Sequence, residues 1–317
     1  MFGRPTHKLE CRALAPAALP LALTNGTGQS VLQVEFAENL RLAELGDAAA
    51  QFRVGFSLFS SSGTAISIEK ASVWFQRSSR QGHKAAQGVC AIYGFGETKN
   101  ESKGFKQVRT AAHAGGRDAQ FLFGVCHHQG FGTTVNNKEA VKWFRLAADQ
   151  GIAVAQINLG LCFYGGKGVP QDGKEAVRWY RLAAEQGYAA AQYNLGLSYD
   201  CGEGVAQDTK EAAKWYQLAA EQGCAAAQCS LGVCFEKGTG VPQDAEEAVK
   251  WYRLAAEQGH ALAQCNLGVT LVNGPPGVAK NIPEGIKWLR AAAAHGPADQ
   301  AGATAIAALK QLGVAIA

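Results

Sequence analysis

The sequence predicts an all-α protein, a right-handed α/α superhelix (solenoid) of about seven stacked helix-turn-helix repeats of 36 residues. One glutamine marks the repeat, and its copies lie 36 residues apart except for one interval of 33. A tryptophan follows five of these glutamines after 23 residues and a sixth after 24, which uses all six tryptophans of the chain. The glutamines are Gln51, Gln87, Gln120, Gln156, Gln192, Gln228, Gln264 and Gln300.

Each repeat is expected to contain two helices. Helix one of the repeat at 188–223 contains AAAQYNLGLSY, in which Ala191, Leu195 and Tyr199 recur every four residues and share one face. Helix two of the preceding repeat contains KEAVRWYRLAAEQG, whose apolar residues follow the three-and-four spacing of a buried stripe. A single helix pair cannot cover such a stripe, whereas stacked neighbours can.

The ends of the helices carry matching signals. Helix two is expected to begin at Asp172, with Glu175 three residues later in a capping-box pattern. It is expected to end at Gly187, where a left-handed cap favours glycine. A glycine-rich loop that ends in valine, such as GGKGVPQD, joins the two helices.

A glycine inside helix one follows the repeat glutamine after four residues in six repeats. Glycine in a helix interior costs roughly 0.5–1 kcal/mol relative to alanine. We therefore expect helix two to cross here so closely that no Cβ fits, with the tryptophan filling the adjoining gap. The glycines are Gly55, Gly124, Gly160, Gly196, Gly232 and Gly268.

The domain boundaries follow from the repeat register. Residues 1–33 are expected to be a disordered or targeting leader, and residues 34–46 a degenerate N-terminal capping helix with Glu38 at the tryptophan position. Residues 297–317 are expected to form a C-terminal capping helix. The seven repeats are expected at 47–82, 83–115, 116–151, 152–187, 188–223, 224–259 and 260–296.

These patterns resemble Sel1-like repeats, relatives of the tetratricopeptide repeat. The matching residues read A-x-A-Q-x-x-L-G-x-x-[YF] in helix one, G-x-G-V in the loop and E-A-[VA]-[KR]-W-[YF]-x-x-A-A-[ED]-Q-G in helix two. The resemblance spans about 250 residues and is strongest from 116 to 296. It implies adaptor or scaffold work, in which peptide segments are bound and complexes assembled. Pentatricopeptide repeats have a similar period and read RNA, but the loop glycines and the tryptophan favour the Sel1 type.

By analogy with the tetratricopeptide superhelix, helix one is expected to line a concave, partner-binding face. The residue after each glutamine and the residue five after it are expected to point there, and between them lies a polar ladder of Asn158, Asn194, Ser230 and Asn266. Asparagine amides can donate to and accept from a peptide backbone. The alternative is that the apolar residues pack between repeats and the asparagines bond within the stack. The partner-binding candidates are Asn158, Asn194, Asn266, Ile157, Tyr193, Leu161, Leu197 and Val233.

Catalytic and metal-binding motifs are sparse, so no enzyme activity, metal or cofactor is expected. Ser67 and Lys70 form an S-x-x-K pattern, as in penicillin-binding enzymes, but no K-T-G or S-D-N accompanies it. Cys126, His127 and His128 are consecutive, whereas metal ligands are usually spaced on one face. Some secreted Sel1-like proteins with paired cysteines have been linked to β-lactam binding, so a β-lactam-interacting protein or another hydrolase is one alternative function. An RNA-binding helical repeat is the other.

Charge and cysteine usage bound the partners and the compartment. The net charge is only +4, and lysine and arginine mostly alternate with acidic residues, so a nucleic-acid partner is not expected. No run of 18 apolar residues exists, so no membrane span is expected. The nine cysteines offer no good disulfide pair, which favours a reducing, cytoplasmic location, with secretory or organellar targeting by the N-terminus as the alternative. A protein or peptide partner is expected, and the oligomeric state is undetermined.

Overall fold

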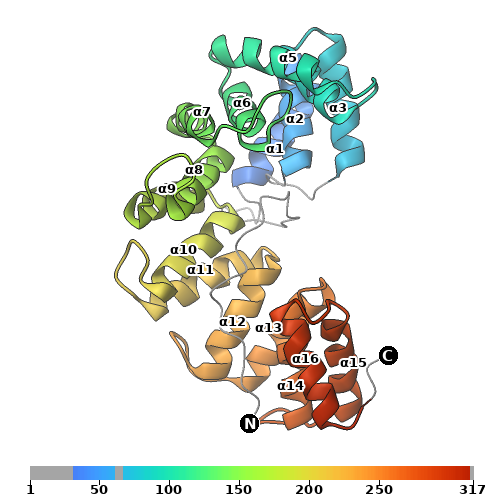
Figure 1. Ribbon diagram of the computed structural model, residues 1–317, viewed down its shortest axis with the longest axis vertical. Coiled ribbons are helices and arrows are strands. Elements are labelled where there is room, and N and C mark those ends of the chain that lie inside the picture. The colour runs from blue at the N-terminus through green and yellow to red at the C-terminus, as the bar shows by residue number, and fades with distance from the viewer. Residues whose placement is uncertain (1–30, 61–66, 315–317) are drawn as a thin grey trace. The chain divides into compact units, whose positions relative to one another are not determined.

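The computed structural model describes residues 31–60 and 67–314 and is shown in Figure 1. Within these residues all regular structure is helical, and consecutive helices pack in pairs, so the predicted all-α fold is confirmed. The expected leader lies outside the described residues up to residue 30. The described chain divides into two compact units, which meet in sequence between Gln207 and Asp208.

The unit that ends at Gln207 contains ten helices within its described residues. Each helix packs on the next in sequence. The helices are α1 (Val31–Glu44), α2 (Ala48–Ser60), α3 (Ile68–Arg80), α4 (Lys84–Tyr93), α5 (Glu101–His113), α6 (Arg117–Gln129), α7 (Asn137–Asp149), α8 (Ala153–Gly165), α9 (Gly173–Glu185) and α10 (Ala189–Cys201).

The unit that begins at Asp208 contains the remaining six described helices, again packed in sequence. The last of them also packs on the helix two before it, so α16 covers both α14 and α15. The helices are α11 (Thr209–Glu221), α12 (Ala225–Lys237), α13 (Ala245–Glu257), α14 (Ala261–Asn273), α15 (Ile282–Ala293) and α16 (Gln300–Gln311).

Asp172 is the N-cap of α9, as predicted, and its carboxylate accepts from the backbone N–H groups of Lys174 and Glu175 at 2.9 and 3.2 Å. The reciprocal half of the predicted capping box is wrong. The Glu175 carboxylate pairs with Arg178, and the N–H of Asp172 donates to Phe163 O at 3.0 Å instead. That bond fixes the start of helix two against helix one of the same repeat.

The two loop glycines serve different purposes. Gly166 caps α8 in the left-handed conformation, with φ of 63°. Gly168 also has a positive φ, and a Cβ there would collide with the backbone carbonyl of Asn137 in the first turn of α7. The second glycine therefore lets the loop of one repeat lie directly on helix two of the repeat before it.

The close helix crossing at the helix-one glycine is confirmed, but the predicted role of the tryptophan is wrong. A Cβ on Gly160 would lie 2.5 Å from Tyr180 Cε1, so the ring one residue after Trp179 covers the glycine. The tryptophan instead packs towards the preceding repeat. In α7, the Trp143 ring lies 4.9 Å from that of Phe123 and 5.1 Å from that of His113.

The 33-residue interval arises from a shortened helix one. In α4 the crossing glycine is Gly88, which follows the repeat glutamine directly but lies six residues before the cap Gly94, as Gly124 lies before Gly130. Three residues are therefore missing between the glutamine and the glycine. The sequence reasoning missed Gly88 because it counted from the glutamine alone.

The repeat glutamine joins three helices. Gln156 Nε2 donates to Ala148 O at the end of α7 at 3.1 Å, and its Oε1 accepts from Gln186 Nε2 at the end of α9 at 2.8 Å. The same pair of bonds is made by Gln51 with Ala43 and Gln81, by Gln120 with Ala112 and Gln150, and by Gln228 with Ala220 and Gln258. In the last repeat Gln264 Oε1 is buried without a partner, because Ala294 stands thirty residues later.

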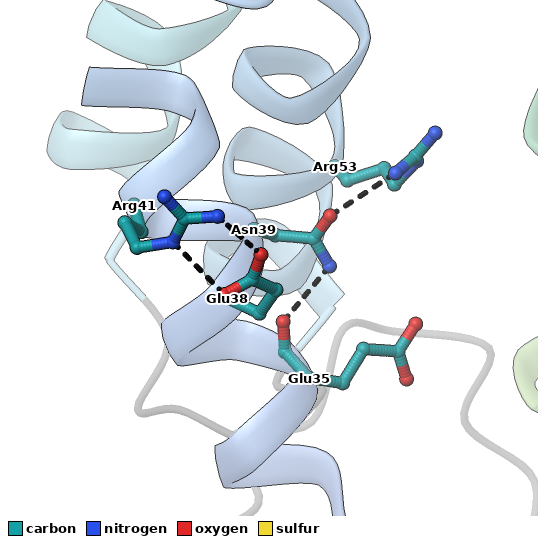
Figure 2. Close-up of polar contacts among 5 residues, drawn as sticks. All are labelled: Glu35, Glu38, Asn39, Arg41 and Arg53. Carbon is teal, nitrogen blue, oxygen red and sulfur yellow. Dashed lines mark hydrogen bonds and ion pairs between the residues drawn. The ribbon is translucent and has the colours of Figure 1, made fainter. Parts of the chain in front are cut away.

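The first helix, α1, occupies the place of a helix two, and Figure 2 shows how it is joined to α2. Asn39 Nδ2 donates to Glu35 O at 2.9 Å, and its Oδ1 accepts from Arg53 Nη1 on α2 at 3.1 Å. Glu38, at the tryptophan position, is exposed and pairs with Arg41 at 2.8 Å. The hydrogen bond from Arg41 lowers the pKa of Glu38.

Candidate functional site

The predicted partner-binding residues divide into half-exposed and buried groups. Five are half-exposed on helix one, and they form the surface that remains a candidate site. In the unit that ends at Gln207 these are Asn158 and Leu161 on α8 with Tyr193, Asn194 and Leu197 on α10. Val233 on α12 is also half-exposed, in the unit that begins at Asp208.

The other two candidates are buried, which removes them from that surface. Ile157 is buried because the residue after the repeat glutamine faces helix two of its own repeat. The same position in α6 shows the contact directly, since the Phe121 ring lies 5.7 Å from that of Phe144. Asn266 is only 5 % exposed, because α16 packs on α14. The expectation that these two side chains are open to a partner is therefore corrected.

The asparagines of the ladder keep part of their hydrogen-bonding capacity. Asn158 Nδ2 donates to Val154 O one turn earlier at 2.7 Å, which is a bond within its own helix. One N–H and the amide oxygen of Asn158 are not used in that bond. The Asn194 carbonyl accepts from Ser198 Oγ at 3.0 Å, which occupies its backbone group and not its side chain.

Helix one is almost uncharged, whereas helix two is strongly charged. No charged residue occurs in α8, and Asp200 is the one such residue in α10. The neighbouring α9 contains five: Lys174, Glu175, Arg178, Arg181 and Glu185. A surface of this composition favours a partner that offers backbone groups and apolar side chains over one that offers charge.

Charged residues gather at the start of α6. Asp118 is half-buried there, and burial raises its pKa, while the nearby Arg117 and Arg53 act in the opposite direction. The carboxyl of Asp118 is therefore harder to ionise than an exposed aspartate. This polar group lies on α6, one repeat before the uncharged surface of α8 and α10.

The motifs singled out as possible chemistry have structural roles. Ser67 is the N-cap of α3, and its Oγ accepts from the backbone N–H of Lys70 at 3.4 Å. Cys126 is buried, and burial raises its pKa to about 12. The His127 ring packs 4.7 Å from the Phe123 ring, while His128 Nδ1 contacts Asn137 Oδ1 at 2.9 Å. Within the described residues no group of three or more potential ligands is arranged to hold a metal ion.

Among the described cysteines there is no disulfide. Seven of these eight are buried, and Cys201 at the end of α10 is exposed. Burial raises the pKa of Cys90 and of Cys162 to about 11 each. Thiols with a raised pKa carry little thiolate at neutral pH and react slowly.

A cavity of about 430 Å³ in the unit that begins at Asp208 was not found by sequence reasoning. It lies beneath the α14–α15 loop, which contains Pro275 and Pro276. The available signal was this loop itself, because NGPPGV is one residue longer than the G-x-G-V loops of the other repeats and is the only one with two prolines.

No helix in the described part of the chain is both long and apolar enough to cross a membrane. The model of the Sel1 repeat matches residues 48–83, 117–152, 153–188, 189–224, 225–260 and 261–297, which is more than half of the chain. The shortened pair α4–α5 lies between the first two matches.

Two solved structures are similar over most of the chain. One is a protective antigen present in uropathogenic Escherichia coli strains that displays an SLR fold; it is 34% identical with a TM-score of 0.67 over 89% of this chain. This chain spans only 61% of that protein's length. The other is a Sel1 repeat protein from Oxalobacter formigenes, 31% identical with a TM-score of 0.65, over 92% of this chain and 82% of that one. No curated protein matches the sequence.

Proposed function

Because this chain belongs to the Sel1 repeat family, we propose that it is a non-catalytic scaffold or adaptor that binds a peptide or a partner protein. The proposed contact surface, called the helix-one surface below, consists of Asn158, Leu161, Tyr193, Asn194 and Leu197 on α8 and α10. The observation that carries the proposal is the recurrence of the same half-exposed asparagine and leucine, two and five residues after the glutamine, in consecutive repeats.

The recurrence suits an extended peptide. Each asparagine offers both a donor and an acceptor to a peptide backbone, and each leucine offers an apolar contact to a side chain. A loss of core packing does not explain the exposed asparagine, because Leu159 and Leu195, one residue later, already fill the core. The near absence of charge on α8 and α10 favours recognition by backbone and apolar groups.

Site-specific photo-crosslinking tests the helix-one surface. A photo-reactive phenylalanine analogue at Leu161 or Leu197 is expected to crosslink to the partner. The matched control is Leu182 on α9, which is also an exposed leucine but lies on helix two. Crosslinking from Leu182 alone would overturn the proposed surface.

A double variant separates binding from stability. Asn158→Ala with Asn194→Ala is expected to abolish capture of the crosslinked partner while the thermal midpoint falls only slightly. The one printed side-chain bond that is lost is the half-buried Asn158–Val154 contact, and a hydrogen bond of that kind contributes about 1 kcal/mol. A lower midpoint with unchanged capture would assign the asparagines to the stack and refute their role in binding.

The absence of catalysis is part of the proposal and has its own test. Ser67 serves as a helix cap, and the side chain of Lys70 is exposed on the outside of α3. Incubation with a labelled β-lactam, followed by mass spectrometry, is expected to give no adduct. An adduct on Ser67 would establish acyl transfer and overturn this part of the proposal.

We further propose a reducing location such as the cytoplasm. The support is that the described cysteines are present as thiols, most of them buried. Titration of the denatured, unreduced protein is expected to give nine thiols for the nine cysteines of the chain. A lower number would indicate a disulfide and an oxidising compartment.

A further inference from the structure

We infer that the cavity beneath the α14–α15 loop is a binding site for a guanidinium group on a short aliphatic stem. The cavity, called the loop pocket below, is lined by Glu236, Gln243, Ala245, Ala248, Thr270, Asn273, Pro275 and Pro276. All of these residues belong to the unit that begins at Asp208. The site is separate from the helix-one surface, so the inference does not depend on the proposed function.

The pocket exists because the last loop departs from the arrangement of the others. In the α12–α13 loop, a Cβ on Gly240 would collide with the backbone carbonyl of Thr209, so that loop lies directly on the first turn of helix two. Gly132 and Gly168 lie in the same way on the first turns of α5 and α7. At Gly277 the nearest atom to such a Cβ is a side-chain oxygen of Glu246 at 3.3 Å, and no backbone atom is among the nearest neighbours.

The inserted residue and the two prolines account for that difference. The N–H of Val278 donates to Pro275 O at 2.9 Å, which closes a turn around Pro276 and Gly277. Proline fixes φ and has no N–H, so the turn is stiff. The stiff, longer loop stands away from α13 and leaves the loop pocket between them.

The polar wall of the loop pocket is held in place. Tyr252 is fully buried, and its hydroxyl donates to Glu236 Oε2 at 2.9 Å, which fixes the carboxylate. Gln243 Nε2 donates to Glu236 O at 2.9 Å, which leaves the amide oxygen of Gln243 as its acceptor. Thr270 is 2 % exposed, and its Oγ1 donates to Asn266 O at 2.8 Å.

The charge around the loop pocket favours a cation. Glu236 is the one charged residue of the lining, and no lysine or arginine is part of it. The first turn of α13 adds Asp244 as N-cap and the exposed Glu246 near the loop. These carboxylates outweigh the positive N-terminal end of α13, because the Asp244 side chain already accepts from two of its N–H groups.

A guanidinium group fits these features better than an ammonium group. It presents five donors in one plane, which matches a carboxylate together with the amide oxygens of Gln243 and Asn273. It is also more weakly hydrated than an ammonium ion, so its transfer into a pocket costs less. The walls formed by Ala248, Pro275 and Pro276 are apolar and suit an aliphatic stem.

Titration of the full-length, ¹⁵N-labelled protein with N-acetyl-L-argininamide tests the inference. Saturable shifts are expected at the backbone amides of Ala245, Ala248 and Thr270. Glu236→Gln is expected to weaken binding at least about tenfold, because a charge-assisted hydrogen bond becomes a neutral one. Glu203→Gln, the same change on an exposed loop of the other unit, is expected to leave affinity unchanged.

A second variant guards against misfolding at Glu236. Tyr252→Phe removes only the hydroxyl that fixes the carboxylate, and it is expected to weaken binding several-fold with the spectrum otherwise unchanged. The absence of saturable shifts, or equal affinity of wild type and Glu236→Gln, would overturn the inference. Equal binding of N-acetyl-L-lysinamide would overturn the preference for guanidinium.

The source of the guanidinium is decided by a comparison of two probes. Agmatine represents a free small molecule, and acetyl-Ala-Arg-Ala-amide represents an arginine side chain in a partner peptide. Tighter binding of agmatine assigns the loop pocket to a small molecule, and tighter binding of the tripeptide assigns it to a peptide. Either result supports the inferred chemistry, and failure of both probes refutes it without touching the helix-one surface.

Discussion

Replacement of Gly160 by alanine tests the close crossing of α8 and α9. An ideal Cβ at this position would lie 2.5 and 2.7 Å from Cε1 and Cδ1 of the Tyr180 ring. Non-bonded carbon atoms prefer about 3.5–4.0 Å, so the ring must shift by roughly 1 Å or the helices must separate. Tyr180 is itself buried, which leaves its ring no free space.

The magnitude follows from two opposing contributions. Alanine in place of glycine in a helix interior stabilises by roughly 0.5–1 kcal/mol, whereas overpacking of a buried site costs about 1–3 kcal/mol. The net effect expected for Gly160→Ala is a destabilisation of about 1–2 kcal/mol. For a unit of this size that corresponds to a fall of roughly 2–8 °C in the melting midpoint.

The same helix supplies the control. Gly165 is also helical, but a Cβ there would meet only Lys167 Cγ at 3.8 Å, an ordinary contact. Gly165→Ala is therefore expected to stabilise by a few tenths to about 1 kcal/mol. Both variants are to be compared by thermal and urea unfolding followed by circular dichroism. If Gly160→Ala stabilises as much as Gly165→Ala, the crossing is not as close as the structure has it.

Three further outcomes are expected. Gln186→Ala leaves the buried Gln156 oxygen without its donor and is expected to cost about 1–3 kcal/mol in urea unfolding, whereas Gln171→Ala on an exposed loop should cost little; equal costs would refute the role of the glutamine pair. The pKa of His83 is lowered, chiefly by burial, so its contribution to stability is complete above the unfolded value of about 6.5 and is lost as pH falls towards the folded value. A melting-midpoint series from pH 7.5 to 5 should therefore fall less steeply for His83→Asn, which keeps a helix cap without titrating, and an unchanged slope would contradict this. Finally, of the described cysteines only Cys201 is expected to react rapidly with a thiol reagent in the native protein, so rapid labelling of a buried one, located by peptide mapping, would show that the core opens.

The helix boundaries were predictable because the signals are local. Asp172 caps α9 through N–H groups two and three residues away, and Gly166 ends α8 by its own backbone conformation. Neither requires a distant partner. For the same reason the repeat register, written by glutamine and tryptophan at a fixed spacing, was enough to predict the helix pairs.

The shortened pair shows where counting along the sequence failed. The crossing glycine of α4 keeps its distance from the loop and not from the repeat glutamine, since helix two crosses near the loop end of helix one. Only the packing of α4 on α5 reveals that Gly88 plays this part. The resemblance of the sequence alone placed no glycine there.

The sequence by itself determined the number, length and caps of the helices, because these depend on propensities and hydrogen bonds within a few residues. Tertiary structure decided which side chains fill the crossings and which remain open. Trp179 and Tyr180 are adjacent in sequence but about 100° apart around α9, so the direction of the crossing selects the tyrosine for the glycine. Asn158 and Asn266 occupy the same position in their repeats, yet α16 buries the second and leaves the first half-exposed. Burial of that kind depends on a helix more than thirty residues away, which no local pattern specifies.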